Sequence, residues 1–276
     1  MSAASPPGAT ADQLRRLAIE AASAAGALLA EHASALAAGA DLEVRHKDSA
    51  TDPVSLADAA SERAIVERLS ADRPDDGILG EEGEGRRPGT TGLTWIIDPL
   101  DGTVNFLYGQ PTWVVSIAVV DAEGPLAGAV LQPSTGELFH AHRGGGAWLG
   151  DRRLSLTDPA ELAFALVATG FAYDRDVRTA WGAHLAGLLG QVRDIRRGGA
   201  AALDLCWVAA GRLDGYVEFA LHPWDWAAGQ LLVTEAGGRV SEVEVRLGDQ
   251  PRGGLVAGGP RVHDALLGFL DREVSA

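Results

Sequence analysis

Two carboxylates, Asp98 and Asp101, close a short apolar segment in the stretch WIIDPLDGTVNF and are the residues best suited to chemistry. Pro99 lies between them, has no N–H to donate and favours a bend, so both side chains can converge on one point. Two unneutralised carboxylates that lie so near each other repel, and this repulsion raises the pKa of one of them. A divalent cation would remove the repulsion. Because Asp, Pro and Gly are also common in turns, this motif alone leaves a simple turn open.

Further acids lie near the ends of other predicted strands. Glu81 and Glu82 follow a short apolar pair that is typical of a buried strand, and open α/β sheets bind ligands outside the carboxyl ends of their strands. Asp225 stands where the N-cap of a following helix belongs, which is a structural role by itself. Its nearness in sequence to Glu218, at the end of another predicted strand, leaves a second role open.

Two polar segments carry weaker signals. Gly198 and Gly199 precede a predicted helix, and two glycines would let a ligand approach the free N–H groups at its N-terminus, although a packing turn explains them equally well. The stretch from Val44 to Asp58 is rich in polar groups that could face a site or could form a solvated linker with capping residues.

The elements that must position these residues follow from periodicity and turn signals. An antiparallel meander is expected up to Leu154, followed by alternating strands and helices. We expect a disordered lead at 1–10, an N-terminal half at 11–154 and a C-terminal half at 155–276 that packs on it as one unit. Helices are predicted at 11–38, 55–72, 177–191, 200–210, 226–236 and 261–274, and strands at 78–79, 95–97, 114–120, 126–131, 137–141, 146–149, 165–168, 192–196, 213–218 and 254–257.

Composition narrows the class of partner. The formal charge of −15 over 276 residues argues against nucleic acid as the main partner, because such binding depends on clustered Lys and Arg.

Arg15 and Arg16 precede an Ala- and Leu-rich segment that resembles an export signal, but Glu20 interrupts it, so we interpret it as an amphipathic surface helix. No segment has the ~20 apolar residues of a membrane span. The single cysteine, Cys206, lies in an apolar run and indicates a buried thiol in a reducing compartment, the cytoplasm.

Three stretches in register resemble the signatures of the inositol monophosphatase family, in its bacterial branch. They are Gly80-Glu81-Glu82, then the segment from Trp95 to Phe106, then Trp224 to Gly229 with Thr234 to Gly238. The resemblance extends from Lys47 to Gly238. It implies a layered αβαβα sandwich of the inositol monophosphatase and fructose-1,6-bisphosphatase type, a lithium-sensitive, magnesium-dependent phosphomonoesterase, and a homodimer.

The resemblance also implies roles for single residues. The first Mg²⁺ ion would be held by Glu81, Asp98 and the backbone carbonyl of Leu100, and the second by Asp98, Asp101 and Asp225, so that both ions share Asp98. Glu81 would reach a third ion through water. Thr103, hydrogen-bonded toward Asp58, would help Glu81 to polarise the attacking water. The substrate would contact Gly102, Thr103, Gly199, Ala200, Ala201 and Glu218. Hard oxygen ligands suit Mg²⁺, and a pair of ions about 3.5–4 Å apart suits in-line displacement at phosphorus.

We therefore expect hydrolysis of myo-inositol 1-phosphate and related small polyol phosphates by activated water. Histidinol phosphate is the alternative substrate, and other phosphate esters are weaker candidates. A different class of function is a regulatory binding protein of the transcription machinery.

Overall fold

The computed structural model describes residues 9–39, 45–46, 53–54, 56–83, 85–247 and 250–273. Most of the expected lead at 1–10 and most of the polar stretch from Val44 to Ser55 lie outside the described residues. Thr10 is described and begins the first helix, since its hydroxyl accepts a hydrogen bond from Gln13 N (3.2 Å) and Gln13 Oε1 accepts one from Thr10 N (2.8 Å).

Among the described residues, the first half of the chain builds three helices, a two-stranded sheet of β1 and β2, and a seven-stranded sheet. Strands β3 and β4 pair in parallel and the remaining neighbours pair antiparallel, in the order β3-β4-β5-β6-β7-β8-β9. The predicted meander is therefore confirmed. The elements are α1 (Ala11–Ala37), β1 (Arg45–His46), β2 (Pro53–Val54), α2 (Leu56–Asp72), β3 (Gly77–Gly80), β4 (Thr94–Asp101), α3 (Thr103–Leu107), β5 (Val114–Asp121), β6 (Gly124–Gln132), β7 (Glu137–His142), β8 (Gly146–Leu149) and β9 (Arg152–Arg153).

The second half builds four helices and a five-stranded sheet. Its strand order is β11-β10-β12-β14-β13, in which β10 is parallel to both β11 and β12, and β14 is antiparallel to its neighbours. The elements are η1 (Leu162–Phe164), β10 (Leu166–Thr169), α4 (Arg175–Leu189), β11 (Asp194–Arg196), α5 (Ala201–Ala209), β12 (Gly215–Phe219), α6 (Pro223–Glu235), β13 (Arg239–Leu247), β14 (Gln250–Gly258) and α7 (Pro260–Glu273).

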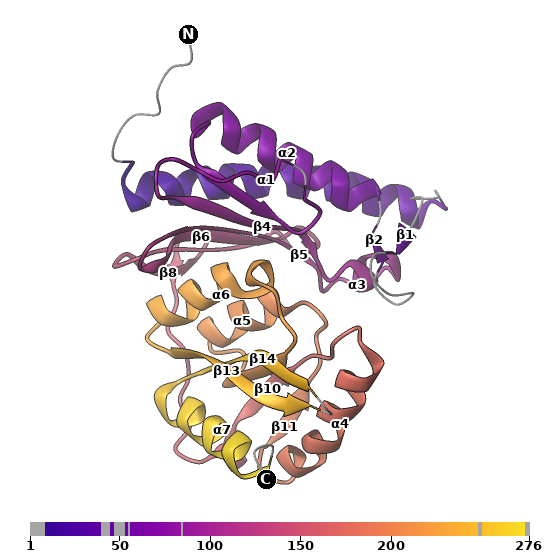
Figure 1. Ribbon diagram of the computed structural model, residues 1–276, viewed down its shortest axis with the longest axis vertical. Helices are drawn as coiled ribbons and strands as arrows, with labels where there is room; N and C mark the ends of the chain where they lie inside the picture. Colours follow the sequence, from indigo (N-terminus) through magenta and orange to yellow (C-terminus); the bar gives the residue numbers. More distant parts are fainter. Residues whose placement is uncertain are drawn as a thin grey trace.

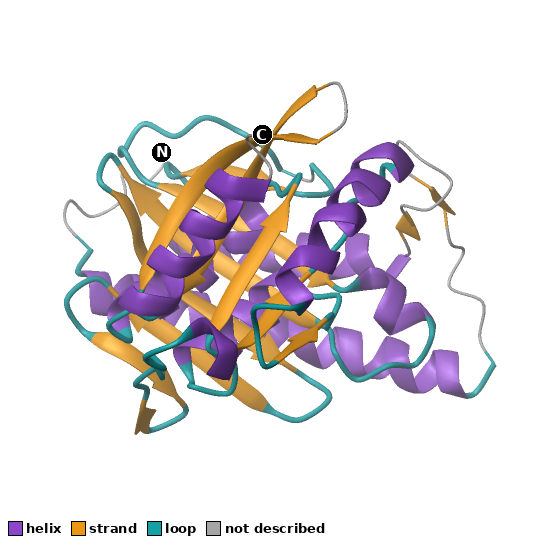
Figure 2. Ribbon diagram, turned by 90° about the horizontal axis from the view of Figure 1, so that it is seen from below, coloured by secondary structure: helices purple, strands orange, loops and turns teal. Residues whose placement is uncertain are grey.

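These elements stack in five layers (Figure 1). Helices α1 and α2 cover the outer face of the seven-stranded sheet, α5 and α6 lie between the two sheets, and α4 and α7 cover the five-stranded sheet. Figure 2, viewed from below, shows helices lying across the strands of this second sheet. The expected αβαβα sandwich is confirmed.

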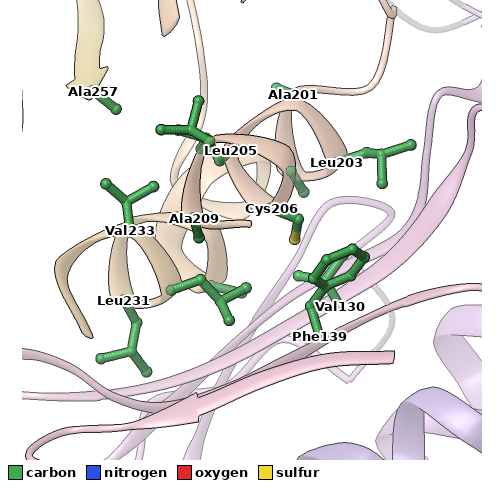
Figure 3. Packing of buried hydrophobic residues seen from close by; sticks show 14 of the residues in the cluster. Val130, Phe139, Ala201, Leu203, Leu205, Cys206, Ala209, Leu231, Val233 and Ala257 are labelled. Carbon is green, nitrogen blue, oxygen red and sulfur yellow. The ribbon is translucent and has the colours of Figure 1, made fainter. Parts of the chain in front are cut away.

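Apolar side chains fill the spaces between these layers. The helical period of α1 predicts an apolar stripe of Leu17, Ala21, Leu28 and Leu29. Leu17, Ala21 and Leu29 are buried against the seven-stranded sheet, whereas Leu28 is only half-buried. Between the sheets, α5 and α6 pack on β6 and β7, and Cys206 lies there beside Val130 and Phe139 (Figure 3). The prediction of a buried cysteine thiol is thus confirmed. Among the described helices, none is both long and apolar enough to cross a membrane.

Several elements differ from the prediction, among them α6 and β13. Helix α6 begins at Pro223, three residues before the expected Trp226, because proline at the first helical position has a suitable φ and needs no hydrogen-bond partner for nitrogen. Strand β13 was not predicted, although Val243, Val245 and Leu247 alternate with charged residues. Such alternation is typical of an edge strand with one solvated face.

Candidate functional site

The turn after β4 places the first two acids. Strand β4 pairs regularly with β5 up to Asp98, and the register then shifts before Asp101, where Pro99 cannot donate to the ladder. Leu100 N donates to Asp98 Oδ1 (3.0 Å), and the buried Ser61 hydroxyl donates to Pro99 O (2.8 Å). The turn is therefore fixed from within and from α2.

Gly102 ends this turn in a conformation that glycine favours. Its φ is 92°, and it is the N-cap of the short helix α3. A Cβ at this position would lie 2.8 Å from Thr112 O and 3.3 Å from Ala200 Cβ, so the backbone here touches both halves of the molecule. The first N–H groups of α3 follow directly, at the position where the family resemblance implies contact with the substrate.

Four of the predicted acids act on one another electrostatically. Asp98 is only 2 % exposed, and its pKa lies well above the usual range, first because burial disfavours its charged form. The charges of Glu81, Asp101 and Asp225 add to the rise, as does a side-chain hydrogen bond between Asp98 and Glu81. These acids come from the ends of β3 and β4 and from the first turn of α6.

Asp101 and Asp225 are also held by backbone donors. Ala202 N donates to Asp101 Oδ2 (2.7 Å), and His222 N donates to Asp225 Oδ2 (2.6 Å). Burial raises the pKa of Asp101 to about 7 in spite of that hydrogen bond. Burial likewise raises the pKa of Asp225, and the charges of Asp101 and Glu81 raise it further.

These contacts correct two expectations. Asp225 is not the N-cap of α6: His222 is, and Asp225 lies in the first turn and accepts the N–H of that cap. The N-terminus of α5 was expected as an anion site or a packing turn. Its amides at Ala201 and Ala202 bind the carboxylate of Asp101, so the anion belongs to the chain itself.

The acids are neighbours, but they do not yet point at one centre. Within the described part of the chain, no three or more His, Cys, Asp or Glu side chains are arranged so that they could hold a metal ion as they stand. The backbone bonds of Asp98, Asp101 and Asp225 give a physical reason, since each carboxylate is turned toward an N–H of the protein. Rotation of these side chains would be needed to share a cation.

Thr103 lies where the sequence placed it. Its side chain is buried, and its hydroxyl lies 3.1 Å from Asp58 Oδ1 and 3.1 Å from Leu100 O. Both neighbours are acceptors, so the hydroxyl proton is directed into the protein and the oxygen lone pairs remain available to accept a hydrogen bond.

Four of the predicted substrate residues lie around the start of α5 and near the end of β12, and we call these four the wall. Ala200 and Ala201 are buried at the start of α5, while Gly199 and Glu218 are half-buried. Tyr216 donates its hydroxyl proton to Glu218 Oε2 (2.7 Å). Burial raises the pKa of Glu218 to about 7, whereas the Tyr216 hydrogen bond and the charge of Arg197 act to lower it.

Three residues beside the wall were not predicted. Asn105 Nδ2 donates to Thr112 O (2.6 Å) and Gly198 O (2.9 Å) and so connects α3 to the turn before α5. Asp204, an acid inside an apolar helix, is 1 % exposed beneath Gly198, and that position in an apolar run was an available signal. Arg197 precedes the Gly-Gly turn, and its charge acts on both Glu218 and Asp204.

Comparison with known proteins finds relatives that match most of this chain. Residues 10–273 match the model of the family described as "Inositol monophosphatase family". An inositol-1-monophosphatase of Mycobacterium bovis is 44% identical over 245 residues, which cover 84% of this chain and 82% of that protein. The Nus factor SuhB of Escherichia coli is 40% identical over 261 residues, which cover 94% of this chain and 96% of that protein. The crystal structure of extragenic suppressor protein SuhB from Bartonella henselae superposes with a TM-score of 0.85 at 36% identity and covers 95% of this chain and 99% of that one.

Proposed function

The chain belongs to the inositol monophosphatase family, and on that premise we propose that it is a Mg²⁺-dependent phosphomonoesterase acting on myo-inositol 1-phosphate and related small polyol phosphates. The observation that carries the proposal is the mutual repulsion of Asp98 with Glu81, Asp101 and Asp225 in a largely buried place. Uncompensated carboxylates of this kind are stabilised by a hard divalent cation.

The donor set fits magnesium, because every candidate ligand is a carboxylate or carbonyl oxygen. The residues that would hold the ions are Glu81, Asp98, the carbonyl of Leu100, Asp101 and Asp225. When bound, Mg²⁺ supplies Lewis-acid polarisation of the phosphate and lowers the pKa of water. Two or three ions are proposed.

The chain's own groups would prepare the nucleophile. Thr103 directs its proton toward Asp58 and Leu100 O, so its oxygen can accept a hydrogen bond from the attacking water and orient it. Glu81 is the group we propose to accept the proton of that water. The buried Cys206 thiol packs in the apolar core between the sheets, which favours direct attack by water over a cysteinyl intermediate.

The substrate would lie across the two halves of the molecule. We assign its phosphate to the N–H groups of Gly102 and Thr103, and its alcohol part to the wall of Gly199, Ala200, Ala201 and Glu218. Gly102 and Ala200 are neighbours, which supports a phosphate bound at the seam between the halves.

A panel of phosphate esters tests this assignment. Phosphate release from myo-inositol 1-phosphate, histidinol phosphate and fructose 1,6-bisphosphate would be measured with Mg²⁺ and again after EDTA. We expect release from the inositol ester with Mg²⁺ and none with EDTA. A preference of more than tenfold for histidinol phosphate would favour the alternative substrate, and activity that survives EDTA would contradict the metal dependence.

A second role of another class is supported by one observation. The relative from E. coli is named a Nus factor, so we also consider binding to the transcription machinery. Capture of RNA polymerase by the immobilised protein, compared with the same experiment on an Asp98→Asn variant, would test this role separately from catalysis.

We further propose a homodimer and a cytoplasmic location. Sedimentation analysis would test the dimer.

A further inference from the structure

The wall assigned to the substrate alcohol is built at the carboxyl ends of three parallel strands. Strand β10 lies between β11 and β12, and all three run in the same direction. Arg197 follows the end of β11, Gly170 follows the end of β10, and Glu218 is the penultimate residue of β12. Side chains from the two flanking strands thus face a central position that has no side chain of its own.

The side chains of Glu218 and Arg197 each pack against a glycine of the wall region. The carboxylate of Glu218 occupies the place that a Cβ on Gly170 would fill. The guanidinium of Arg197 folds back over Gly199 in the same manner, with its Nη1 against that glycine, and Asn105 Nδ2 lies 3.0 Å from the same Cβ position. A cation therefore covers the glycine that the sequence assigned to the wall.

The guanidinium N–H groups of Arg197 are available as hydrogen-bond donors. Its side chain is exposed, and among the described residues it takes part in no ion pair or hydrogen bond. The preceding Arg196 differs, since its Nη1 lies 2.5 Å from Asp194 Oδ2. Arg197 nevertheless lies near enough to Glu218 and Asp204 for its charge to lower the pKa of both acids. Donor groups and an acceptor carboxylate are thus present at the ends of β11 and β12, the two strands that flank β10.

We propose that Arg197 and Glu218 together recognise adjacent hydroxyl groups of the substrate alcohol, with Arg197 as hydrogen-bond donor and Glu218 as acceptor. The inference rests on the proposed phosphatase function and makes Arg197 a residue that determines specificity. A vicinal diol offers one hydroxyl to accept from the guanidinium and one to donate to the carboxylate. A cationic amino alcohol such as histidinol phosphate is repelled by Arg197.

The test compares Arg197→Ala with the wild-type protein and with Arg196→Ala, a matched variant that removes the adjacent, paired arginine. KM and kcat would be measured for myo-inositol 1-phosphate and histidinol phosphate in Mg²⁺. Loss of a charge-assisted hydrogen bond should raise KM for the inositol ester about tenfold while kcat changes less than about twofold. The kcat/KM ratio of histidinol phosphate to the inositol ester should rise, and Arg196→Ala should leave both unchanged.

Two further readouts separate this role from others. Inhibition by inorganic phosphate should be unchanged in Arg197→Ala, because the phosphate lies elsewhere; weakened inhibition would instead make Arg197 a phosphate ligand and overturn the proposal. Should Arg197→Ala fold poorly by thermal melting, Arg197→Lys keeps the charge without the forked donors and should still raise KM several-fold.

The two levels of the account can fail separately. An unchanged KM for the inositol ester in both Arg197 variants, in an active enzyme, overturns the diol recognition alone. A wild-type protein that hydrolyses none of the esters contradicts the phosphatase assignment itself.

Discussion

Asp98 lies among three other carboxylates, so its substitution separates catalysis from folding. We expect Asp98→Asn to lower kcat by at least ~100-fold, because a ligand proposed to be shared by two ions is lost. The melting temperature in EDTA should be equal to or higher than that of the wild-type protein, since removal of one charge relieves repulsion from Glu81, Asp101 and Asp225. Steady-state kinetics and thermal melting would measure both.

Asp264→Asn is the matched control for this experiment. Asp264 is exposed and pairs with Arg239 at 2.9 Å, far in sequence from the acid cluster. That change should leave kcat unaltered and move the melting temperature little. Near-normal turnover in Asp98→Asn would refute the shared-ligand role.

The junction of β4 and α3 depends on one glycine. Gly102→Ala would place a non-glycine residue at a φ of 92° and a methyl group 2.8 Å from Thr112 O. We expect a loss of about 1–3 kcal/mol in the free energy of unfolding and a clear loss of kcat/KM, because the predicted phosphate-binding amides move. Urea denaturation and kinetics would measure these effects.

Gly109→Ala is the control, since Gly109 has a φ of 68° and open space where a Cβ would stand. Gly109→Ala should show the strain of a positive φ without a close contact at the new methyl group, and it should retain kcat/KM. Equal losses in the two variants would show that close contact at Gly102 is unimportant.

A buried ion pair holds α2, β3 and β4 together. Asp76 is fully buried and accepts hydrogen bonds from Arg73 Nε (2.8 Å), Thr91 Oγ1 (2.7 Å) and Trp95 Nε1 (3.0 Å). We expect Asp76→Ala to lower the free energy of unfolding by about 3–5 kcal/mol, because it leaves the Arg73 charge buried and unpaired. Chemical denaturation would measure the loss.

The exposed pair of Asp72 with Arg68 provides the comparison. Asp72→Ala should cost no more than about 1 kcal/mol. A similar small cost for Asp76→Ala would mean that the buried network contributes little to stability.

Local sequence predicted those parts of the site that depend on local chemistry. The Asp-Pro-Leu-Asp-Gly turn and the strand that ends just before Glu81 lie where the local sequence predicted them. The contact of Thr103 with Asp58 joins distant residues and was an expectation from the family resemblance alone. The sequence did not predict the early start of α6, because Asp225 has the residue type of an N-cap.

Other parts depend on contacts between distant segments. Asp76 precedes Gly77, a pair typical of turns, yet it is buried because Trp95 and Thr91 reach it from the next strand and loop. The anion at the N-terminus of α5 is Asp101, which is 101 residues earlier than its donor Ala202. Neither pairing has a signal in the nearby residues. The boundary between halves at Leu154 stays a prediction.

At the scale of the whole molecule, acids gathered between the two halves make metal-free stability depend on pH. The pKa values of Asp101 and Glu218 rise to about 7 from ordinary values of 3.8 and 4.5. The folded state therefore holds protons that the unfolded state releases, so stability is greatest below about pH 4 for these groups and is lost as pH rises toward 7.

We expect the melting temperature in EDTA to fall between pH 5 and pH 8. A pKa rise of about three units corresponds to a loss of about 4 kcal/mol in the free energy of unfolding. Because the side chains of Asp101 and Glu218 are partly exposed, the actual loss is smaller. Asp101→Asn should flatten the profile. A melting temperature that rises through this range in the wild-type protein would contradict the assigned pKa shifts.

The central claim is that acids from β3, β4 and α6 gather around magnesium. Calorimetric titration of MgCl₂ into the metal-free protein at pH 7.5 tests this claim most directly. The account predicts a saturable binding isotherm that is abolished or greatly weakened in Asp98→Asn and unchanged in Asp264→Asn. An isotherm identical in the wild-type protein and in Asp98→Asn, or no binding to the wild-type protein at all, would contradict it.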